Sequence, residues 1–563
     1  MTNLSLVLFL VVQLCLIKLS LTFEYSPIVQ TTKGPVKGRV FTTIRESKRY
    51  HSYRGIPYAQ PPTGYLKFAA PKEPNAWKDV FDASKEGNLC PQILNNKFVG
   101  NEDCLQLNVY TPQLPKNGTE PKAVLCWIFG GSFIRGQNMK KYYSPDYIIE
   151  EDLILVSINY RLGALGFLSL ENKNASGNAG LKDQSLALKW VQDNIHNFGG
   201  DPKKVTLMGI SAGSASVGYQ LLSERSKGLF RNTISMSGAP LCFWAFDRPE
   251  QVRSKVMQIA RRLGYNGTRE NLLEFYYNVN VQSLTEVIDN YSSIDLPMRP
   301  VLEDANYVPD AFISECSLKK YMSGNFNHGP VMMGYTKNET LIYLATKKSH
   351  QELIDNVMAY SKKLQCIQHI RSLYSPAEIF KNDTSKDNYS TTTIQFTSDV
   401  AFIAPIDYTQ KLLSKYNDPI YYYRYDFDYD NSLHKIDYGV DINGSAHGDE
   451  IVMIFYSDRF KIDPNANNSI TLLQKRMTRM WANMAKYGNP TPNGTNDNLL
   501  NIVWPDSRKS GKMLWLNEEL KIHDRYKDPI IDIVQFGIKH FGAQSNGCNL
   551  NYTKKAVKTI PHN

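Results

Sequence analysis

The chain has 563 residues, of which 42% are hydrophobic and 12% aromatic, so it can bury a large core. Its formal net charge of +10 comes from lysines and arginines scattered along the sequence. Nucleic-acid binders usually concentrate basic charge on one face, so we expect a solvated basic surface and no nucleic-acid partner. No Pro/Ser/Gly-rich linker, charge run or internal repeat marks a boundary, which favours one large domain.

The N-terminal segment, residues 1–22, is an apolar stretch of secretory signal length. Lys18 interrupts it too early for a transmembrane helix, and small residues suit cleavage near Thr22–Phe23. The C-terminal residues offer neither a lipid-anchor tail nor a retention tetrapeptide. We therefore expect a secreted protein without a stable membrane anchor, with a single domain over residues 23–545 and a short polar tail at 546–563.

Sequons and cysteines agree with the secretory route. Seven cysteines remain after the signal, an odd number, so at least one is unpaired within a monomer. Cys90 and Cys104 close a short loop and are the best disulfide candidates, worth roughly 3 kcal/mol by chain entropy. Cys126 lies in an apolar run and is expected to be buried. Eleven sequons predict a glycoprotein: Asn117, Asn174, Asn266, Asn290, Asn338, Asn382, Asn388, Asn443, Asn467, Asn493 and Asn551.

Short apolar runs alternate with helical patterns along the chain. Near-continuous Val/Ile/Leu/Met content predicts buried strands at 123–129, 152–159, 204–210, 232–238 and 329–336. Between two of them, Leu188, Val191 and Ile195 repeat at helical spacing, and two glycines end the pattern. This alternation predicts an α/β fold with a mostly parallel, helix-covered sheet. The Tyr-rich run at 421–430 alternates with period two, which favours a strand with one solvent-exposed face.

A Gly-X-Ser-X-Gly turn occupies residues 209–213, between an apolar run and a stretch of small residues. Gly209 and Gly213 leave space beside Ser211, as a strained strand–turn–helix requires of a nucleophile. A helix beginning near Ala212 would direct its positive end and free N–H groups at an anion formed there. The pattern alone also occurs in ordinary turns between buried elements, so it needs support from the rest of the chain.

A glycine-rich loop, "WIFGGSFIRG" at 127–136, directly follows a predicted strand. A peptide N–H group approaches a substrate oxygen closely only where no side chain intervenes. We infer that the N–H groups of Gly131, Ser132 and Ala212 form an oxyanion hole. Loss of one such donor typically lowers the rate by about 100- to 1,000-fold.

Several long motifs in one order carry a resemblance to a known family. They are "RGIPYAQPPTGYLKFAAP", "NEDCLQLNVYTP", "INYRLGALGF", "GNAGLKDQSLALKWVQDNIHNFGGDPKKVTLMGISAGSASV" and "GSAHGDEI". Over nearly all of the mature chain, the sequence resembles a type-B carboxylesterase of the cholinesterase-like α/β-hydrolase family. The resemblance implies a large, mostly parallel sheet with helices on both faces, and no metal or organic cofactor.

The resemblance also implies three catalytic residues, in the chain order that this fold uses. Ser211 is the expected nucleophile, Glu339 the acid and His447 the base. His447 would take the Ser211 proton, while Glu339 would fix the imidazole tautomer and stabilise the imidazolium. Spacing alone does not select His447 among ten histidines.

Further features are implied by the same resemblance. Cys90 and Cys104 are expected to form a disulfide. Two internal ion pairs are expected to orient loops around the site: Arg54 with Glu102, and Arg161 with Asp183. Three aromatic residues are similar in position to acyl-pocket walls, although ordinary core packing is an equal interpretation for each: Trp244, Phe402 and Phe133.

The chain departs from its family at several positions. Ile210 stands where Glu usually precedes the nucleophile, which predicts a more apolar pocket and a poorer host for cations. The loop from Cys90 to Cys104 contains no Trp, so the choline-stacking residue of cholinesterases is missing and an acetylcholinesterase is not expected. Three other departures add steric demand or remove a partner: Ser132 in the oxyanion loop, Thr340 after the acid, and Tyr265 in place of the cysteine expected to pair with Cys242.

The sequence thus predicts a secreted serine carboxylesterase that hydrolyses small to medium lipophilic esters, with a small-molecule ester as its partner. Two alternatives stay open: a cholinesterase-like binding or adhesion protein with weak or no activity, and a juvenile-hormone-type esterase. The latter group favours Gln before the serine, which Ile210 does not match. Asn338 adjoins Glu339 in a segment expected to be buried, so we expect this sequon to stay unglycosylated. Oligomeric state and natural substrate are left open.

Overall fold

The computed structural model describes residues 23–290, 298–373, 391–493 and 497–542. The predicted signal peptide, the predicted C-terminal tail and the sequons Asn382, Asn388 and Asn551 lie outside the described residues.

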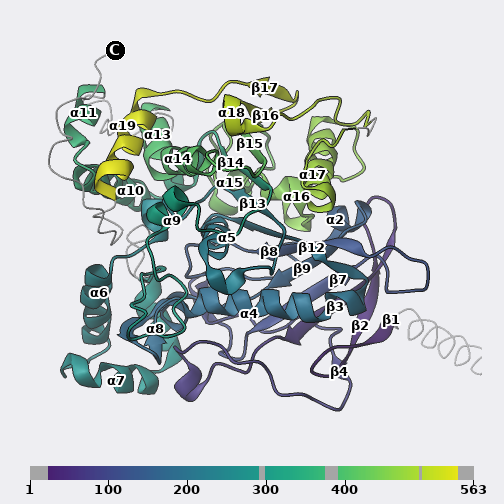
Figure 1. The fold of residues 1–563 in the computed structure, drawn as a ribbon, viewed down its shortest axis with the longest axis horizontal. Helices are drawn as coiled ribbons and strands as arrows, with labels where there is room; N and C mark the ends of the chain where they lie inside the picture. The colour runs from purple at the N-terminus through teal and green to yellow at the C-terminus, as the bar shows by residue number, and fades with distance from the viewer. Residues whose placement is uncertain (1–22, 291–297, 374–390, 494–496, 543–563) are drawn as a thin grey trace, which may run out of the picture.

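One large sheet crosses the molecule (Figure 1). In the described residues it has 13 strands, in the order β1-β2-β3-β7-β9-β8-β12-β13-β14-β15-β16-β17, with β4 paired to β2. The strands are β1 Tyr25–Gln30, β2 Pro35–Thr42, β3 Arg49–Pro57, β4 Phe81–Asp82, β7 Gln106–Thr111, β8 Lys122–Ile128, β9 Ile154–Ile158, β12 Gly200–Ile210, β13 Asn232–Met236, β14 Val331–Thr336, β15 Ile420–Tyr425, β16 Met513–Leu516 and β17 Lys521–His523. The run from β9 to β16 is parallel, and antiparallel strands flank it at both ends. Two short hairpins lie outside it: β5 Gln92–Leu94 with β6 Lys97–Val99, and β10 Ser169–Asn172 with β11 Ala175–Ser176.

Helices cover the sheet, and α4 runs across its front in Figure 1. The α-helices are α2 Asp146–Glu150, α3 Gly163–Phe167, α4 Ala179–Asn194, α5 Ala212–Leu222, α6 Pro249–Arg262, α7 Leu272–Asn278, α8 Val281–Asp289, α9 Ser317–Ser323, α10 Lys347–Lys363, α11 Ile367–Leu373, α13 Thr391–Ser398, α14 Ala404–Leu413, α15 Leu433–Tyr438, α16 Ile451–Ile454, α17 Ser469–Tyr487, α18 Ser507–Ser510 and α19 Pro529–Gly537. Two π-helical turns occupy Asp399–Ile403 and Ile538–Gly542. Within the ranges described above, no helix is both long and apolar enough to cross a membrane.

The predicted strands and the predicted helix are confirmed. The five apolar runs form β8, β9, β12, β13 and β14, and the helical pattern forms α4, which a 3₁₀ turn and Gly199 (φ 83°) end. The prediction that one face of the Tyr-rich strand is exposed to solvent is wrong, because every residue of β15 is buried. This strand lies inside the parallel part of the sheet, between β14 and β16, where helices cover both faces.

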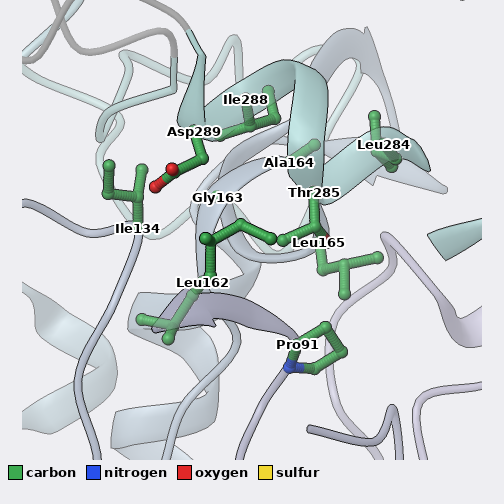
Figure 2. Close-up of a pocket in the computed structure, with 11 residues that line it drawn as sticks. Pro91, Ile134, Leu162, Gly163, Ala164, Leu165, Leu284, Thr285, Ile288 and Asp289 are labelled. Atoms are coloured by element: carbon green, nitrogen blue, oxygen red, sulfur yellow. The ribbon is translucent and has the colours of Figure 1, made fainter. Parts of the chain in front are cut away.

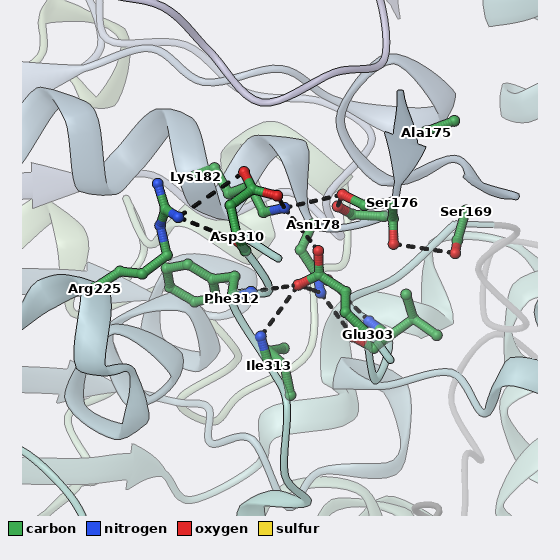
Figure 3. A network of polar contacts seen from close by, with 12 residues as sticks. Ser169, Ala175, Ser176, Asn178, Lys182, Arg225, Glu303, Asp310, Phe312 and Ile313 are labelled. Carbon is green, nitrogen blue, oxygen red and sulfur yellow. Dashed lines mark hydrogen bonds and ion pairs between the residues drawn. The ribbon is translucent and has the colours of Figure 1, made fainter. Parts of the chain in front are cut away.

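A buried polar network ties the start of α4 to the segment that precedes α9 (Figure 3). The Lys182 ammonium lies 2.8 Å from Glu303, and both side chains are fully buried. Asn178 donates to the second Glu303 oxygen at 2.8 Å, and the Phe312 N–H donates to the same oxygen at 2.7 Å. The Ile313 N–H donates there as well, at 3.1 Å, so the charge of Glu303 is compensated by a cation and by three amide donors, as a buried carboxylate requires.

One of the two expected ion pairs is found. Arg161 and Asp183 are buried and bidentate, with nitrogen–oxygen distances of 2.8 and 2.6 Å. The expected partner of Arg54 is wrong: Arg54 pairs with Glu86 at 2.6 Å and also donates to the Ser84 carbonyl. The backbone of the segment after β4 lies against Arg54, because the Arg54 N–H group donates to the Ala83 carbonyl, and this contact selects Glu86.

Cys90 and Cys104 form a disulfide with a Cα–Cα distance of 5.0 Å. Cys126 is buried and free, as its apolar run predicts, and Cys242 is free as well. Tyr265, which takes the place of the cysteine expected to pair with Cys242, packs its ring 4.6 Å from Phe275.

Removal of the buried Asp183 charge should weaken the fold strongly. The variant Asp183→Asn leaves the buried Arg161 guanidinium uncompensated, which costs about 3–5 kcal/mol of unfolding free energy. The matched control is Glu73→Gln, which breaks the exposed Lys33–Glu73 pair (2.8 Å) and should change stability by no more than about 0.5 kcal/mol. Urea unfolding followed by circular dichroism measures both, and equal midpoints for the two variants would contradict the assignment.

Candidate active site

Ser211 lies at the junction of β12 and α5, as the Gly-X-Ser-X-Gly motif predicts. Its backbone has φ 57° and ψ −125°, a conformation that costs a non-glycine residue of order 1–3 kcal/mol. The Ser211 N–H donates to the Met236 carbonyl at 2.9 Å, which anchors the turn to the end of β13. A strained residue with this support is typical of a nucleophile presented on a sharp strand-to-helix turn.

The flanking glycines are required by close backbone approach. A Cβ on Gly209 would lie 2.5 Å from the Gly213 carbonyl oxygen, and a Cβ on Gly213 would collide with the carbonyl of Ile128 at the end of β8. Real Cβ atoms do not approach backbone this closely, so only glycine fits at both positions. The turn therefore packs directly against the neighbouring strand.

The glycine-rich loop after β8 lies against the same turn. A Cβ on Gly130 would be 2.9 Å from the Ser211 Cβ. Gly131 has φ 117° and Ser132 has φ 58°, so the loop backbone is folded tightly beside the serine. Within the part of the chain that the structure describes, the N–H groups of Gly131 and Ser132 donate to no protein acceptor. These amides are thus free to bind an oxygen, and their role as oxyanion donors with Ala212 stays a prediction.

The expected acid and base are joined by a short hydrogen bond. His447 Nδ1 lies 2.5 Å from Glu339 Oε2, and the second carboxylate oxygen accepts the Thr336 N–H at 2.8 Å. Glu339 is fully buried, whereas the His447 side chain is 11% exposed. Because Nδ1 faces the carboxylate, Nε2 is the ring atom left to exchange a proton with a reacting group.

The three expected catalytic residues follow three strands in the parallel part of the sheet. Ser211 follows β12, Glu339 follows β14 and His447 follows β15 in the loop beyond its end. The carboxyl ends of parallel strands meet at one edge of a sheet, where α/β proteins place their sites. In the described residues no hydrogen bond joins the Ser211 hydroxyl to His447, and bonds of this kind often tighten only when substrate binds.

A second carboxyl group, Glu450, is buried beneath the site. Burial raises its pKa well above the usual range, and the nearby Glu339 charge raises it further. Ser237, at the end of β13, donates to Glu450 at 3.1 Å. Burial and the neighbouring Glu339 thus both favour the neutral form of Glu450.

One of the three expected pocket aromatics, Phe402, adjoins the base, and a second, Trp244, packs on Phe402. The Phe402 ring centre lies 4.9 Å from that of His447 and 5.3 Å from that of Trp244. Phe402 is part of the π-helical turn 399–403, a rare element often found at functional sites. Phe133 is fully buried and packs on Phe167 at 5.1 Å. The pocket-wall role of all three stays a prediction.

The departures from the family pattern have structural roles. Ile210 is only 3% exposed. Its Cγ2 would lie 3.3 Å from a Cβ on Gly130, so its apolar side chain packs against the glycine-rich loop. The Thr340 hydroxyl is 2.8 Å from Thr397 and 2.9 Å from Ser398. Thr340 thus bonds the segment after Glu339 to α13, which leads into the turn that carries Phe402.

A small apolar pocket lies beside the glycine-rich loop (Figure 2). Its lining includes Ile134 from the loop, Leu162 and Leu165 from the region of α3, and Ile288 from α8. Its one carboxylate, Asp289, is ion-paired to Arg135 at 3.0 Å. The pocket offers an apolar wall near the site and contains no second set of reacting groups. Among the described residues, no cluster of three His, Cys, Asp or Glu side chains could hold a metal ion.

The sheet order, with these residues at the carboxyl ends of its parallel strands, is that of the α/β-hydrolase fold. A crystal structure of juvenile hormone esterase from Manduca sexta with OTFP covalently attached has a TM-score of 0.77 at 26% identity, covering 90% of this chain and 98% of that chain. The structure of PNB esterase has a TM-score of 0.72 at 28% identity, covering 92% of this chain and 100% of that chain.

The sequence comparisons identify the family. The model of the carboxylesterase family matches residues 25–533. Juvenile hormone esterase from Tribolium castaneum is 33% identical over 521 residues, covering 86% of this chain and 87% of the relative. Carboxylic ester hydrolase from Bombus ignitus is 31% identical over 456 residues, covering 77% and 80%. The chain belongs to the carboxylesterase family and is a carboxylic ester hydrolase.

Two residues that the sequence analysis did not single out also contact this site. His434 and Asp449 are fully buried and bond to each other and to the loop that carries His447. The Asp449 position, two residues after His447, is visible in the "HGDE" motif, whereas nothing in the sequence around His434 indicates its contact.

The variant Gly213→Ala should lose reactivity at Ser211, because its Cβ would collide with the Ile128 carbonyl and displace the turn. A displacement of about 1 Å at a reacting group can lower the rate by about 100-fold. The control Gly228→Ala places its Cβ in open space at a position with φ 76°, so it should cost about 1 kcal/mol of stability and leave activity unchanged. Ester turnover by the two purified variants tests this, and wild-type turnover by Gly213→Ala would contradict the close approach.

Proposed function

We propose that this ester hydrolase is a secreted serine carboxylesterase that acts on small to medium lipophilic esters. The observation that carries the proposal is the buried Glu339–His447 hydrogen bond of 2.5 Å, located at the same sheet edge as the strained Ser211. A histidine oriented by a buried carboxylate, at the same sheet edge as a partly exposed serine on a strained turn, is the arrangement that activates a serine.

The proposed reaction has two halves. The Ser211 hydroxyl oxygen attacks the ester carbonyl carbon while His447 Nε2 accepts the hydroxyl proton, and the buried Glu339 carboxylate stabilises the imidazolium. The N–H groups of Gly131, Ser132 and Ala212 bind the carbonyl oxygen as it becomes negative. His447 then protonates the leaving alcohol, and an acyl-serine remains. Water, deprotonated by His447, attacks the acyl carbon and releases the acid and the free serine.

The surroundings of the site support lipophilic substrates. Ile210, Trp244 and Phe402 present apolar surface around the reacting groups, and the aromatic pair limits the space beside His447. Neither Glu at position 210 nor a Trp in the Cys90–Cys104 loop is present to attract a cation. We expect neutral esters to be preferred, with a small-molecule ester as the ligand.

A juvenile-hormone-type esterase is the second candidate within the enzyme class. Relatives of that name from two insects share the family and the fold, with 33% and 26% identity. The apolar site also suits such an ester. Juvenile-hormone-type esterases are expected to have Gln before the serine, whereas this chain has Ile210. The general carboxylesterase is therefore the preferred proposal.

Covalent labelling of Ser211 tests the mechanism. The purified secreted protein, treated with a fluorophosphonate, should carry one adduct on the Ser211 peptide by mass spectrometry. The Ser211→Ala variant should lose both the adduct and the hydrolysis of aryl esters, a fall of at least about 1,000-fold. No adduct and no turnover from folded wild-type protein would contradict the serine mechanism and favour a binding protein that keeps the fold.

The size of the acyl pocket is tested by shortening Phe402. In Phe402→Leu, longer p-nitrophenyl acyl esters should gain relative to the acetate, by about 10-fold in the ratio of kcat/KM, because one or two methylenes of space are worth about that factor. The control is Phe81→Leu, at β4 far along the chain from the site residues, which should leave the ratio unchanged. Unchanged ratios in both variants would remove Phe402 from the acyl pocket.

A further inference from the structure

The loop that carries His447 contains a tight turn at residues 446–449. The Asp449 N–H donates to the Ala446 carbonyl at 3.0 Å, and Gly448, the third residue of the turn, has φ 89°. Positive φ at this position is the signature of a type II turn and explains the glycine. His447 is therefore a corner residue of the turn. The direction of its side chain depends on how the backbone on either side of the turn is held.

The Asp449 carboxylate links the last residue of this turn to the first. Its Oδ2 accepts the Ala446 N–H at 2.7 Å and also faces the ring nitrogen Nδ1 of His434 at 2.7 Å. Its Oδ1 accepts the backbone N–H of His434 at 3.0 Å. The side chains of His434 and Asp449 are both 0% exposed, so water does not weaken these bonds.

The second ring nitrogen of His434 binds the segment that precedes the turn. Nε2 lies 2.9 Å from the carbonyl oxygen of Ile442, four residues before Ala446. A carbonyl oxygen only accepts, so Nε2 must carry a proton, and Nδ1 faces a carboxylate that also accepts. Both ring nitrogens are therefore donors, and the ring is a buried imidazolium paired with the Asp449 carboxylate. The Ser432 hydroxyl, 3.0 Å from Nδ1, is placed to accept a share of the same proton.

The groups around this pair determine how it titrates. Burial opposes the charge of His434, but the hydrogen bond and the charge of Asp449, together with the Ile442 carbonyl, outweigh burial and raise the pKa of His434 above its ordinary value of 6.5. Lys435 opposes the charge and is itself paired with Asp428 at 3.0 Å. Tyr429 donates to the Asp449 backbone carbonyl at 3.3 Å, and burial raises the pKa of Glu450, the next residue.

We propose that His434 and Asp449 are positioning residues. They form a charged clamp that holds together the two ends of the 442–449 loop, so that His447 stays aligned with Glu339. The proposal rests on the proposed function of His447. The clamped loop meets the acid directly: the Asn338 N–H donates to the Ser445 carbonyl at 2.9 Å and the His447 N–H to the Glu339 carbonyl at 3.3 Å. A shift of the turn therefore changes the geometry of the Glu339–His447 pair.

The sign of the pH effect follows from the raised pKa. The bonds of the imidazolium are fully present below pH 6.5 and are lost as the pH rises through the higher pKa of the folded protein. After loss of one proton the ring keeps its donor at Nδ1 beside the Asp449 carboxylate, and the lone pair of Nε2 then faces the Ile442 carbonyl oxygen, which repels it. The clamp should therefore set an alkaline limit on catalysis, distinct from the acid limit set by protonation of His447.

The test compares His434→Gln with wild type. Glutamine retains a donor near the position of Nε2 and removes the charge and the donor to Asp449. The readout is the rate constant for fluorophosphonate labelling of Ser211 between pH 5 and about pH 10, which depends on His447 as base and not on deacylation. The matched control is His51→Gln, a half-buried histidine on β3 bonded to Ser26 at 3.2 Å.

We expect wild type and His51→Gln to lose labelling reversibly at alkaline pH. His434→Gln should label about 10- to 100-fold more slowly below that limit, with no alkaline fall. The double variant His434→Gln, Asp449→Asn, which removes both charges, should be no slower than His434→Gln because the two act as one unit. A wild-type rate and pH profile in His434→Gln would overturn the clamp, whereas absent labelling of folded wild type would overturn the proposed function instead.

A measurement on wild type keeps the inference testable where the variants do not fold. Hydrogen–deuterium exchange of peptides covering residues 442–449, corrected for the intrinsic pH dependence, should lose protection over the same pH range in which labelling falls. Unchanged protection across that range would overturn the clamp.

Discussion

The site depends on a backbone conformation that a serine adopts only at a cost. Ser211 is held at φ 57° and ψ −125° by its hydrogen bond to Met236 and by contacts that leave no room for side chains at Gly209 and Gly213. The strain is sustained because two buried parallel strands, β8 and β13, fix the turn from both sides. Because these strands are central in the sheet, the turn that carries the serine has buried neighbours on both sides.

Three buried carboxyl groups lie in or near the loops around this turn, and each is stabilised in a different way. Glu339 bonds to His447 and accepts the Thr336 amide N–H. Burial and the neighbouring Glu339 raise the pKa of Glu450 well above its usual range, and Ser237 donates to it. Asp449 pairs with the His434 ring. Glu339 is thus the carboxyl group in direct contact with His447, and Asp449 has a different histidine as its partner.

Much of the fold could be predicted from the chain because apolar runs and helical repeats are local features of the sequence. Apolar runs predicted β8, β9, β12, β13 and β14, and one helical repeat predicted α4. The prediction for β15 failed because its alternating tyrosines suggest a half-exposed strand, whereas its neighbours in the sheet bury both faces. The partner of Arg54 was wrong for a related reason: several carboxylates lie within reach along the sequence, and backbone contacts with Ser84 and Ala83 bring Glu86 to the guanidinium.

The sequence by itself determined the α/β class of the fold and the turn around Ser211, because glycine spacing and apolar periodicity are local consequences of backbone sterics and burial. It determined Glu339 and His447 only through family resemblance, since their spacing carries no physical signal. Tertiary structure alone decided which groups meet across long separations, such as His434 with Asp449 and Phe402 with His447. Those contacts depend on the order of parallel strands in the sheet, and that order is a property of the whole folded chain.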